Sequence, residues 1–213
     1  MVKGKRGGRV RDKWHDKKWA IVQAPVSFGN VQIAQIPITD EDKAIGRIIE
    51  VTLFELWKTD PQQHTIKLYF QIEKIDGDIA HTRFKGHEFA KEFLRSLIRR
   101  GSSMISYVND YTTLDGYKFR VSAIAFSQRR LNSSKKHEIR AIIHESLSSE
   151  IPQKNIDQFV QAVVGPELNA RMHARVKKIV GVRHISVRKT KLLQLPKPQV
   201  ETVQMQAPSQ YYP

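Results

Sequence analysis

The chain has 213 residues, of which 40% are hydrophobic, and it carries a net charge of +15. This apolar content is enough for a folded core and argues against global disorder. The lack of cysteine excludes disulfides and thiolate metal sites, and no run approaches the roughly 18 apolar residues of a membrane-spanning helix. The N-terminus is basic but lacks the apolar segment of a secretory signal, so we expect a cytoplasmic protein.

The positive charge is concentrated in four segments of the chain. Residues 1–19 carry eight Lys or Arg against two acids, residues 83–100 six against two, residues 129–140 five against one, and residues 171–197 nine against none. The remainder of the chain is net acidic. Separate basic segments divided by acidic stretches favour a nucleic acid as the partner, with an anionic membrane surface as a distant alternative.

The first segment predicts an arm. Residues 1–18 are rich in Gly, Lys and Arg and show no hydrophobic periodicity, as in an arm that folds only on binding. Aromatic rings such as those of Trp14, Trp19, Tyr107 and Tyr111 can stack on unpaired bases. We favour core packing for Trp19 and Tyr107, whereas RNA contact and docking onto an RNA-facing surface are equally favoured for Trp14.

A strand-rich region follows the arm. Residues 19–25, 46–53 and 64–75 are rich in β-branched residues, and the third run alternates apolar and polar side chains. Asp76-Gly77 predicts a hairpin turn, with residues 78–86 as the return strand.

One helix is expected to interrupt the strands. Residues 87–101 place apolar side chains at helical spacing. Lys91, Arg95 and Arg99 recur every four residues and would form a basic ridge beside this stripe. A second hairpin is predicted over residues 103–127.

Three further helices are expected after residue 130. Ser133 and Ser134 would cap the first, residues 155–164 would form the second, and Pro166 would open the third.

The last predicted strand combines apolar and basic residues. Ile185 and Val187 lie two apart, as on a strand with one buried face. In an extended chain Lys189 and Lys191 share that face, while Arg188 points to the other side. We therefore expect the strand end to leave the core and to meet phosphates on both sides.

No catalytic or nucleotide-binding pattern is present. The eight histidines have no metal-ligand spacing, and the phosphate-loop, dinucleotide and GxSxG patterns are missing. We therefore expect no catalytic residue, no metal site and no cofactor.

The remaining chemistry is phosphate neutralisation by Lys and Arg, with aromatic rings between them. The candidate RNA-binding residues are Lys3, Lys5, Arg6, Arg9, Arg11, Lys13, Trp14, Lys17, Lys18, Arg83, Lys85, Lys91, Arg95, Arg99, Arg100, Arg129, Arg130, Lys135, Lys136, Arg171, Arg175, Lys178, Arg183, Arg188, Lys189 and Lys191.

Several motifs occur in a specific order along the chain: DKWHDKKWAIVQAP, GRIIEVTLFEL, IKLYFQI, FKGHEFAKEFLRSLIRR, TTLDGYKFRV, IRAIIHE and VRKTKLLQLPKP. Together, over residues 12–198, they resemble the archaeal–eukaryotic small-subunit ribosomal protein family three-Ae, also called e-S-one, and its short archaeal members most of all. The resemblance implies a non-enzymatic structural constituent of the 30S subunit of the cytoplasmic ribosome, near the platform and the mRNA exit side. The implied partners are the 3′ region of the small-subunit rRNA, neighbouring ribosomal proteins and, as a further candidate, mRNA.

The resemblance also implies an α+β fold, with an antiparallel β-barrel-like core, packed helices and a smaller C-terminal α/β part. We expect a basic arm at residues 1–18, a mainly β barrel-like domain with one helix at 19–130, a helical part with the final strand at 131–195, and a flexible tail at 196–213. The family's motif residues correspond here to Lys13, Trp14, Lys17, Lys18, Trp19, Asp115, Gly116, Tyr117, Arg120, Arg188, Lys189 and Lys191.

Two alternatives remain open. The first is an RNA-processing enzyme whose acid–base site is assembled from distant residues. The second is a general nucleic-acid or chromatin coat protein, which would bind duplex DNA as well as rRNA.

Overall fold

The computed structural model describes residues 14–15 and 17–196, so the predictions for residues 1–13 and 197–213 lie outside the described part of the chain. In chain order its helices and strands are β1 (Lys18–Gln23), β2 (Gln32–Ile38), α1 (Glu41–Ala44), β3 (Ile48–Thr52), α2 (Leu53–Trp57), β4 (Ile66–Asp76), β5 (Ile79–Phe89), α3 (Lys91–Leu97), β6 (Met104–Thr112), β7 (Lys118–Ser127), α4 (Ser133–Glu150), α5 (Ile156–Val164), α6 (Glu167–Lys177) and β8 (Val182–Gln194). Single 3-10 turns occur at Val26–Phe28, Pro61–Thr65 and Ile151–Gln153.

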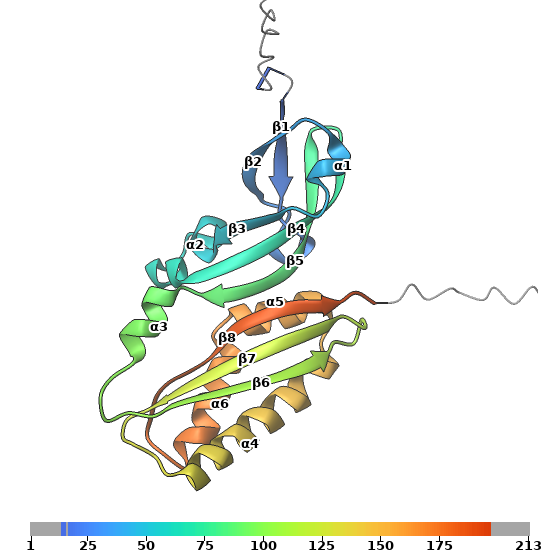
Figure 1. Cartoon of the computed structure of the whole chain (residues 1–213). Coiled ribbons are helices and arrows are strands. Elements are labelled where there is room, and N and C mark those ends of the chain that lie inside the picture. Colours follow the sequence, from blue (N-terminus) through green and yellow to red (C-terminus); the bar gives the residue numbers. More distant parts are fainter. Residues whose placement is uncertain (1–13, 16, 197–213) are drawn as a thin grey trace, which may run out of the picture.

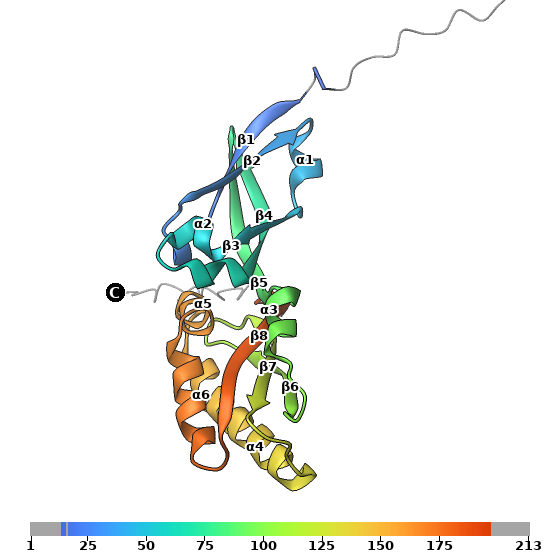
Figure 2. The same cartoon turned by 90° about the vertical axis from the view of Figure 1, so that its left-hand side faces the viewer.

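The molecule is elongated and has two parts along its length. Strands β1–β5 with α1 and α2 form the upper part, and β6–β8 with α4–α6 form the lower part (Figure 1). The view from the side of α3 shows the same division, with α3 beside the boundary (Figure 2).

One long strand, β5, connects the two parts. The eight strands form a sheet in the order β2-β1-β5-β8-β7-β6, and β4 joins β5 and β3 off this path. Because β4 pairs with β5 along one edge, the other edge is left for β1 at Ile79–His81 and for β8 at Gly86–Glu88. The same edge of β5 therefore pairs with β1 of the upper part and with β8 of the lower part.

The fold belongs to the predicted α+β class, but the predicted barrel-like core is not confirmed. Among the described residues, β2, β3 and β6 each pair with one neighbour only, so the sheet is open.

The larger core lies mainly between β6–β8 and the helices α4, α5 and α6, and it continues into the upper part through Phe70 of β4 and Phe84 of β5. In α4 the side chains of Ile139, Ile143 and Leu147 are fully buried at four-residue spacing, so one helix face packs on the sheet. On β7 the alternating residues Phe119 and Val121 supply the facing apolar surface. Each such side chain contributes about 1.5–3 kcal/mol by leaving water. The predicted boundary at residues 130 and 131 falls between β7 and α4, which share this core.

The junction of β5 and β8 depends on Gly86 and His87. A Cβ on Gly86 would lie 2.2 Å from the carbonyl oxygen of Thr190, so only glycine allows this approach of the two strands. The next residue, His87, is buried, and its ring contacts the Thr190 hydroxyl at 2.8 Å and the Val187 carbonyl oxygen at 3.0 Å.

The predicted helix at residues 87–101 is wrong at both ends. Residues up to Phe89 remain in β5, because Phe89 pairs with Ile66 of β4. The helix α3 covers only Lys91–Leu97, and Ile98 is extended and exposed. Lys91 and Arg95 are exposed on α3, but Arg99 follows the helix, so the predicted basic ridge does not continue to it.

The predicted faces of the last strand are also wrong after Val187. Ile185 and Val187 are buried as expected, but Ala123 lies opposite Val187 whereas Ser122 lies opposite Lys189. Arg188 is therefore an extra residue in β8, a β-bulge, and one extra residue reverses the alternation of faces.

Beyond the bulge Thr190 and Leu192 are buried, and Lys189 and Lys191 lie on the face opposite Ile185. The strand also does not leave the sheet at Arg188. It stays paired with β7 as far as Gln194.

One local prediction needs a smaller correction. Asn132, not Ser133 or Ser134, is the N-cap residue of α4. The acidic residues Glu41 and Asp42, between the predicted strands, lie in the one-turn helix α1.

Candidate nucleic-acid interface

Three loops come together at the lower end of the sheet: those that join α3 to β6, β7 to α4, and α6 to β8. The α3–β6 loop precedes Met104, which pairs with Phe126 at the end of β7. Hydrogen bonds connect the loops: the Leu131 backbone N–H donates to the Ser103 hydroxyl at 3.0 Å, and the Gln128 backbone N–H donates to the Gly181 carbonyl at 3.0 Å.

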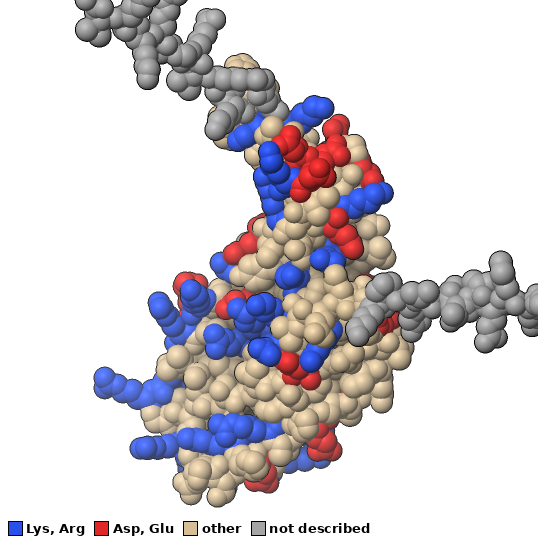
Figure 3. Space-filling model, turned by 45° about the vertical axis from the view of Figure 1, so that its right-hand side comes forward, with Lys and Arg blue, Asp and Glu red and all other residues tan. Residues whose placement is uncertain are grey.

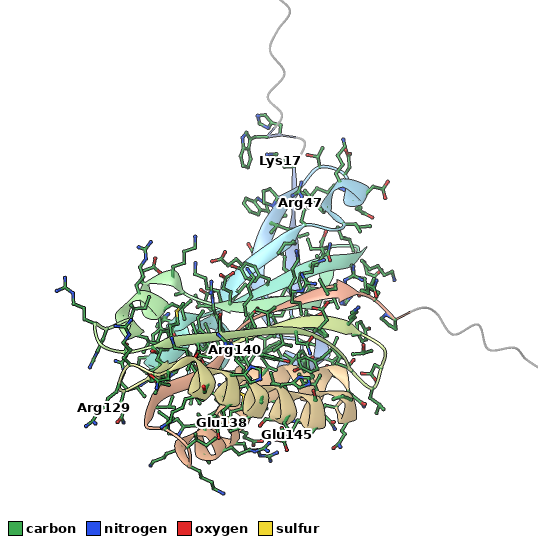
Figure 4. The ribbon with its side chains drawn as sticks, turned by 60° about the horizontal axis from the view of Figure 1, so that its bottom comes forward. Lys17, Arg47, Arg129, Glu138, Arg140 and Glu145 are labelled. Carbon is green, nitrogen blue, oxygen red and sulfur yellow. The ribbon has the colours of Figure 1, made fainter. Side chains whose placement is uncertain are left out.

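These loops and the first turn of α4 carry exposed cations that the sequence predicted as RNA-binding. We call the set Arg99, Arg100, Arg129, Arg130 and Lys135 the basic end. Within the described residues none of these five side chains forms an ion pair with Asp or Glu. Figure 4 shows Arg129 at the margin of the molecule, directed outward and far from Lys17 and Arg47.

A hollow of about 440 Å³ lies within the basic end. Arg129, Arg130 and Lys135 line it together with residues 179–181. The first turn of α4 is adjacent and contains no acidic residue. The partial positive charge of this helix terminus adds to that of the three side chains, so the hollow suits an anion such as a phosphate.

The space-filling view agrees with this distribution of charge. Basic side chains project from the lower part of the molecule, on the side of α3 and of the loops that join α3 to β6 and β7 to α4 (Figure 3). Acidic side chains in the same view gather mainly at the upper end, near α1 (Figure 3).

Arg183 supports the basic end from inside. Its guanidinium donates to the Leu97 carbonyl at 2.8 Å and to the Ser127 carbonyl at 3.4 Å, and the side chain is half-buried. These contacts hold the ends of α3 and β7, from which Arg99 and Arg129 extend. The structure therefore gives this predicted RNA-binding residue an internal, positioning role.

Four other candidates are engaged in ion pairs. Arg83 lies 3.7 Å from Glu73. Arg171 lies 3.4 Å from Glu150, Arg175 lies 2.7 Å from Glu145, and Lys189 lies 2.7 Å from Glu88. A neighbouring carboxylate cancels much of the field that such a cation offers to a phosphate. By contrast Lys178, which follows α6 at the lower end, is exposed and has no acidic partner in the described chain. The side chain of Lys136 is half-buried.

A second group of candidates lies on the middle of the sheet. Arg83 and Lys85 both donate to the Gln71 side-chain oxygen, at 3.3 and 3.1 Å. Lys85 and Lys191 share the lining of a small hollow of about 210 Å³ across the β5–β8 junction. The structure thus brings Lys85 and Lys191 together, but it separates them from the basic end.

The third group lies at the upper end, where the chain enters β1. The Lys17 ammonium lies 3.5 Å from the ring centre of Trp14, and Lys18 is exposed. Trp19 is 59% exposed, so the packing role favoured for it is wrong.

The two tyrosines do not offer free rings. Tyr107 is half-buried, and its hydroxyl contacts His144 Nδ1 at 2.6 Å and the Tyr111 hydroxyl at 3.1 Å. Burial is the main cause of the raised pKa of Tyr107. Tyr111 is itself buried. The packing role predicted for Tyr107 is confirmed.

The structure also assigns local roles that the sequence did not reveal. The Asp115 carboxylate accepts a hydrogen bond of 2.6 Å from the Ile156 N–H at the start of α5, so this motif residue holds a helix end. Arg120 forms two hydrogen bonds with Asp110 across β6 and β7, at 2.7 and 3.0 Å, and thereby lowers the pKa of that carboxyl group. Neither partnership was recognisable without the strand register.

Two basic residues near the candidate surface were missed. Lys177 ends α6 next to Lys178 and is exposed. Lys177 belongs to the basic segment of residues 171–197, so its sequence position was enough to include it among the candidates. Arg140 donates to the Ser106 carbonyl at 3.2 Å, and no sequence pattern predicted this contact with β6 (Figure 4).

The described residues offer neither a metal cluster nor a membrane-spanning helix. No cluster of three or more His, Asp or Glu side chains suited to a metal ion occurs within residues 14–15 and 17–196. Over the same residues no helix has both the length and the apolar character needed to cross a bilayer.

Exposed cations occur on three separated regions of the described chain, as is typical of the class of basic, nucleic-acid-binding proteins. The family model for the Ribosomal S3Ae family matches residues 5–196. The chain therefore belongs to this family.

Curated relatives agree with the family match over most of their length. The chain is 42% identical over 190 residues to the small ribosomal subunit protein eS1 of Desulfurococcus amylolyticus, covering 89% of both chains. It is 40% identical over 187 residues to eS1 of Sulfurisphaera tokodaii, covering 88% of this chain and 96% of the relative. For eS1 of Archaeoglobus fulgidus the identity is 39% over 197 residues, with 92% and 93% covered.

Proposed function

We propose that this protein is a structural, non-enzymatic constituent of the small ribosomal subunit, located on the ribosome in the cytoplasm, where it binds rRNA and adjacent ribosomal proteins. Membership of the Ribosomal S3Ae family over residues 5–196 supports this function most strongly. The relatives carry the name of a small-subunit protein, and neither the enzyme nor the coat-protein alternative has comparable support.

The basic end is our candidate for the main rRNA contact. Its cations come from separate loops whose positions are fixed by Arg183 and by backbone hydrogen bonds. Fixed cations lose little side-chain and loop entropy on meeting the phosphates of a folded RNA. The hollow of about 440 Å³ lined by Arg129, Arg130 and Lys135 would receive backbone phosphates.

The other candidate residues extend this proposal to several faces. Lys85 and Lys191 would contact a second segment of RNA, and the arm of residues 1–18 would bind alongside. We further propose the 3′ region of the small-subunit rRNA as the bound region, with the protein near the platform and the mRNA exit side.

Salt titration of RNA binding tests the proposal. The complete chain is titrated with a labelled fragment of the 3′ region at several salt concentrations. If about eight phosphates are neutralised, the affinity falls by roughly 10³–10⁵ between 50 and 200 mM salt. A nearly flat salt dependence would contradict RNA binding by these charges.

A matched pair of triple variants locates the interface. Replacing Arg99, Arg129 and Arg130 by Gln should lower the magnitude of the log–log salt slope by about 2–3. The control replaces Lys43, Lys67 and Lys74 by Gln, which removes the same formal charge from residues already paired with acids. Equal slopes for both variants would show that the basic end is not the contact.

The same protein distinguishes the two alternative functions. Binding to duplex DNA as tight as binding to rRNA would favour a coat protein, and cleavage of the RNA with turnover would favour an enzyme.

A further inference from the structure

The upper end of the molecule presents an indole ring to solvent. On the β1–β2 ribbon, Ala20 and Val22 face the small core, whereas Trp19 and Ile21 face outward. Trp19 pairs with Pro37, and within the described chain its side chain forms no hydrogen bond or ring contact. A large ring exposed to 59% contributes little to the core, so folding alone does not account for it.

The charges around this ring favour an anionic partner. Arg47 donates to the Pro37 carbonyl at 3.3 Å, which places its guanidinium beside the strand residue opposite Trp19. Lys17 and Lys18 immediately precede Trp19, and Figure 4 shows Lys17 and Arg47 at the same end of the molecule. The sequence of residues 1–19 adds further cations, with eight Lys or Arg against two acids in all.

Phosphate attraction alone does not explain the site. The acidic residues 40–42 lie at the same end of the molecule, and Asp40 pairs with Lys43. These carboxylates weaken the attraction for phosphate, so the exposed aromatic ring has to supply part of the affinity. A ring beside cations suits a ligand that combines a flat apolar face with a negative backbone. An unpaired nucleotide has both properties.

We propose that Trp19 is a base-stacking residue, and that the outer face of the β1–β2 ribbon binds unpaired nucleotides of an RNA strand. This inference rests on the proposed function and assigns single-stranded RNA to the upper end, apart from the basic end. The base lies on the indole, while Lys17, Lys18 and Arg47 are within reach of the adjoining phosphates. A duplex keeps its bases stacked internally and cannot use the ring.

Binding of short RNA oligomers tests this assignment. The probe is a fluorescein-labelled single-stranded oligoadenylate of 12 nucleotides, compared with an RNA duplex of the same length. Anisotropy gives the affinity of the complete chain, and tryptophan fluorescence reports stacking. Trp19→Leu should weaken binding of the single strand about 5- to 100-fold and reduce the quenching of tryptophan fluorescence. Binding of the duplex should not change.

Two further variants separate stacking from a structural effect. Trp19→Phe keeps an aromatic face and should retain most of the affinity for the single strand. Trp57→Leu alters a 39% exposed tryptophan on α2 and should leave that affinity unchanged. Thermal unfolding should confirm that all three variants are folded.

The inference is wrong if Trp19→Leu binds the single strand as tightly as the wild type, or if Trp19→Phe loses as much affinity as Trp19→Leu. A Trp19→Leu protein that binds RNA normally but fails to enter the small subunit would identify a protein partner instead. The rRNA titration separates the two proposals. If the wild type shows a steep salt slope but Trp19→Leu does not change the affinity for the single strand, only the stacking site is overturned and the proposed function stands.

Discussion

Protonation of His87 should destabilise the junction between β5 and β8. The ring is fully buried, and burial lowers the pKa of His87 from 6.5 to about 4. The Val187 carbonyl can only accept, so Nε2 carries the proton and Nδ1 accepts from the Thr190 hydroxyl. That hydroxyl in turn accepts from the His87 backbone N–H at 3.1 Å, so every group is satisfied only while the ring is neutral.

The direction of the pH effect follows from the lowered pKa. Between pH 6.5 and 4 the unfolded chain binds a proton at His87 that the folded chain does not, so the free energy of unfolding falls as the pH falls. Above pH 6.5 this contribution is fully present. A difference of 2.5 pKa units corresponds to about 3 kcal/mol, a large part of the roughly 5–15 kcal/mol of a typical domain.

Thermal unfolding of the wild type and of His87→Gln between pH 7 and 4.5 measures this contribution. Glutamine is neutral throughout, so the comparison cancels the other histidines. At pH 7 the variant should be the less stable protein. By pH 4.5 the wild type should have lost about 2.5 kcal/mol relative to the variant, or about 5–10 °C in Tm. A stability difference that stays constant over this range would refute the reasoning.

Three further substitutions test other parts of the structure. Gly86→Ala should destabilise the protein by at least about 3 kcal/mol in urea titrations, because its Cβ would overlap the Thr190 carbonyl oxygen; an unchanged midpoint would mean that the strands can separate freely. Arg183→Met should lower the free energy of unfolding by about 1–3 kcal/mol in the same assay. It should also weaken rRNA binding, because Arg183 holds the loops of the basic end, but the salt slope should stay as in the wild type, unlike the slope of a variant that lacks Arg99. If Arg183→Met instead lowers the slope at full stability, Arg183 contacts RNA directly. Asp115→Ala should cost about 1 kcal/mol of stability and leave rRNA affinity unchanged, since its carboxylate holds the start of α5; a loss of affinity alone would assign it to the interface.

Local patterns predicted the elements that are long and periodic. The alternation in residues 64–75 predicted β4, and the helix expected to begin at Ser133 or Ser134 is α4, which buries Ile139, Ile143 and Leu147 on one face. These patterns succeed because each reports which side of one element is buried. The end of β5 and the start of α3 were misplaced because pairing of Phe89 with Ile66 outweighs the helical spacing of the same residues.

The register between strands could not be predicted from the sequence. The bulge at Arg188 depends on the pairing of β8 with β7, and it moves Lys189 and Lys191 to the opposite face. Likewise the basic segments identified Arg99 and Arg129 as cations, but only the folded sheet brings their loops together. The exposure of Trp19 depends on which face of the β1–β2 ribbon meets the small core.

A cryo-EM map of small ribosomal subunits that contain this chain would show whether the basic end contacts rRNA. We predict that rRNA phosphates lie within about 4 Å of the guanidinium groups of Arg99, Arg129 and Arg130, the usual distance of a charge-paired contact. A map in which the protein is present but these three side chains face solvent or another protein would contradict the account.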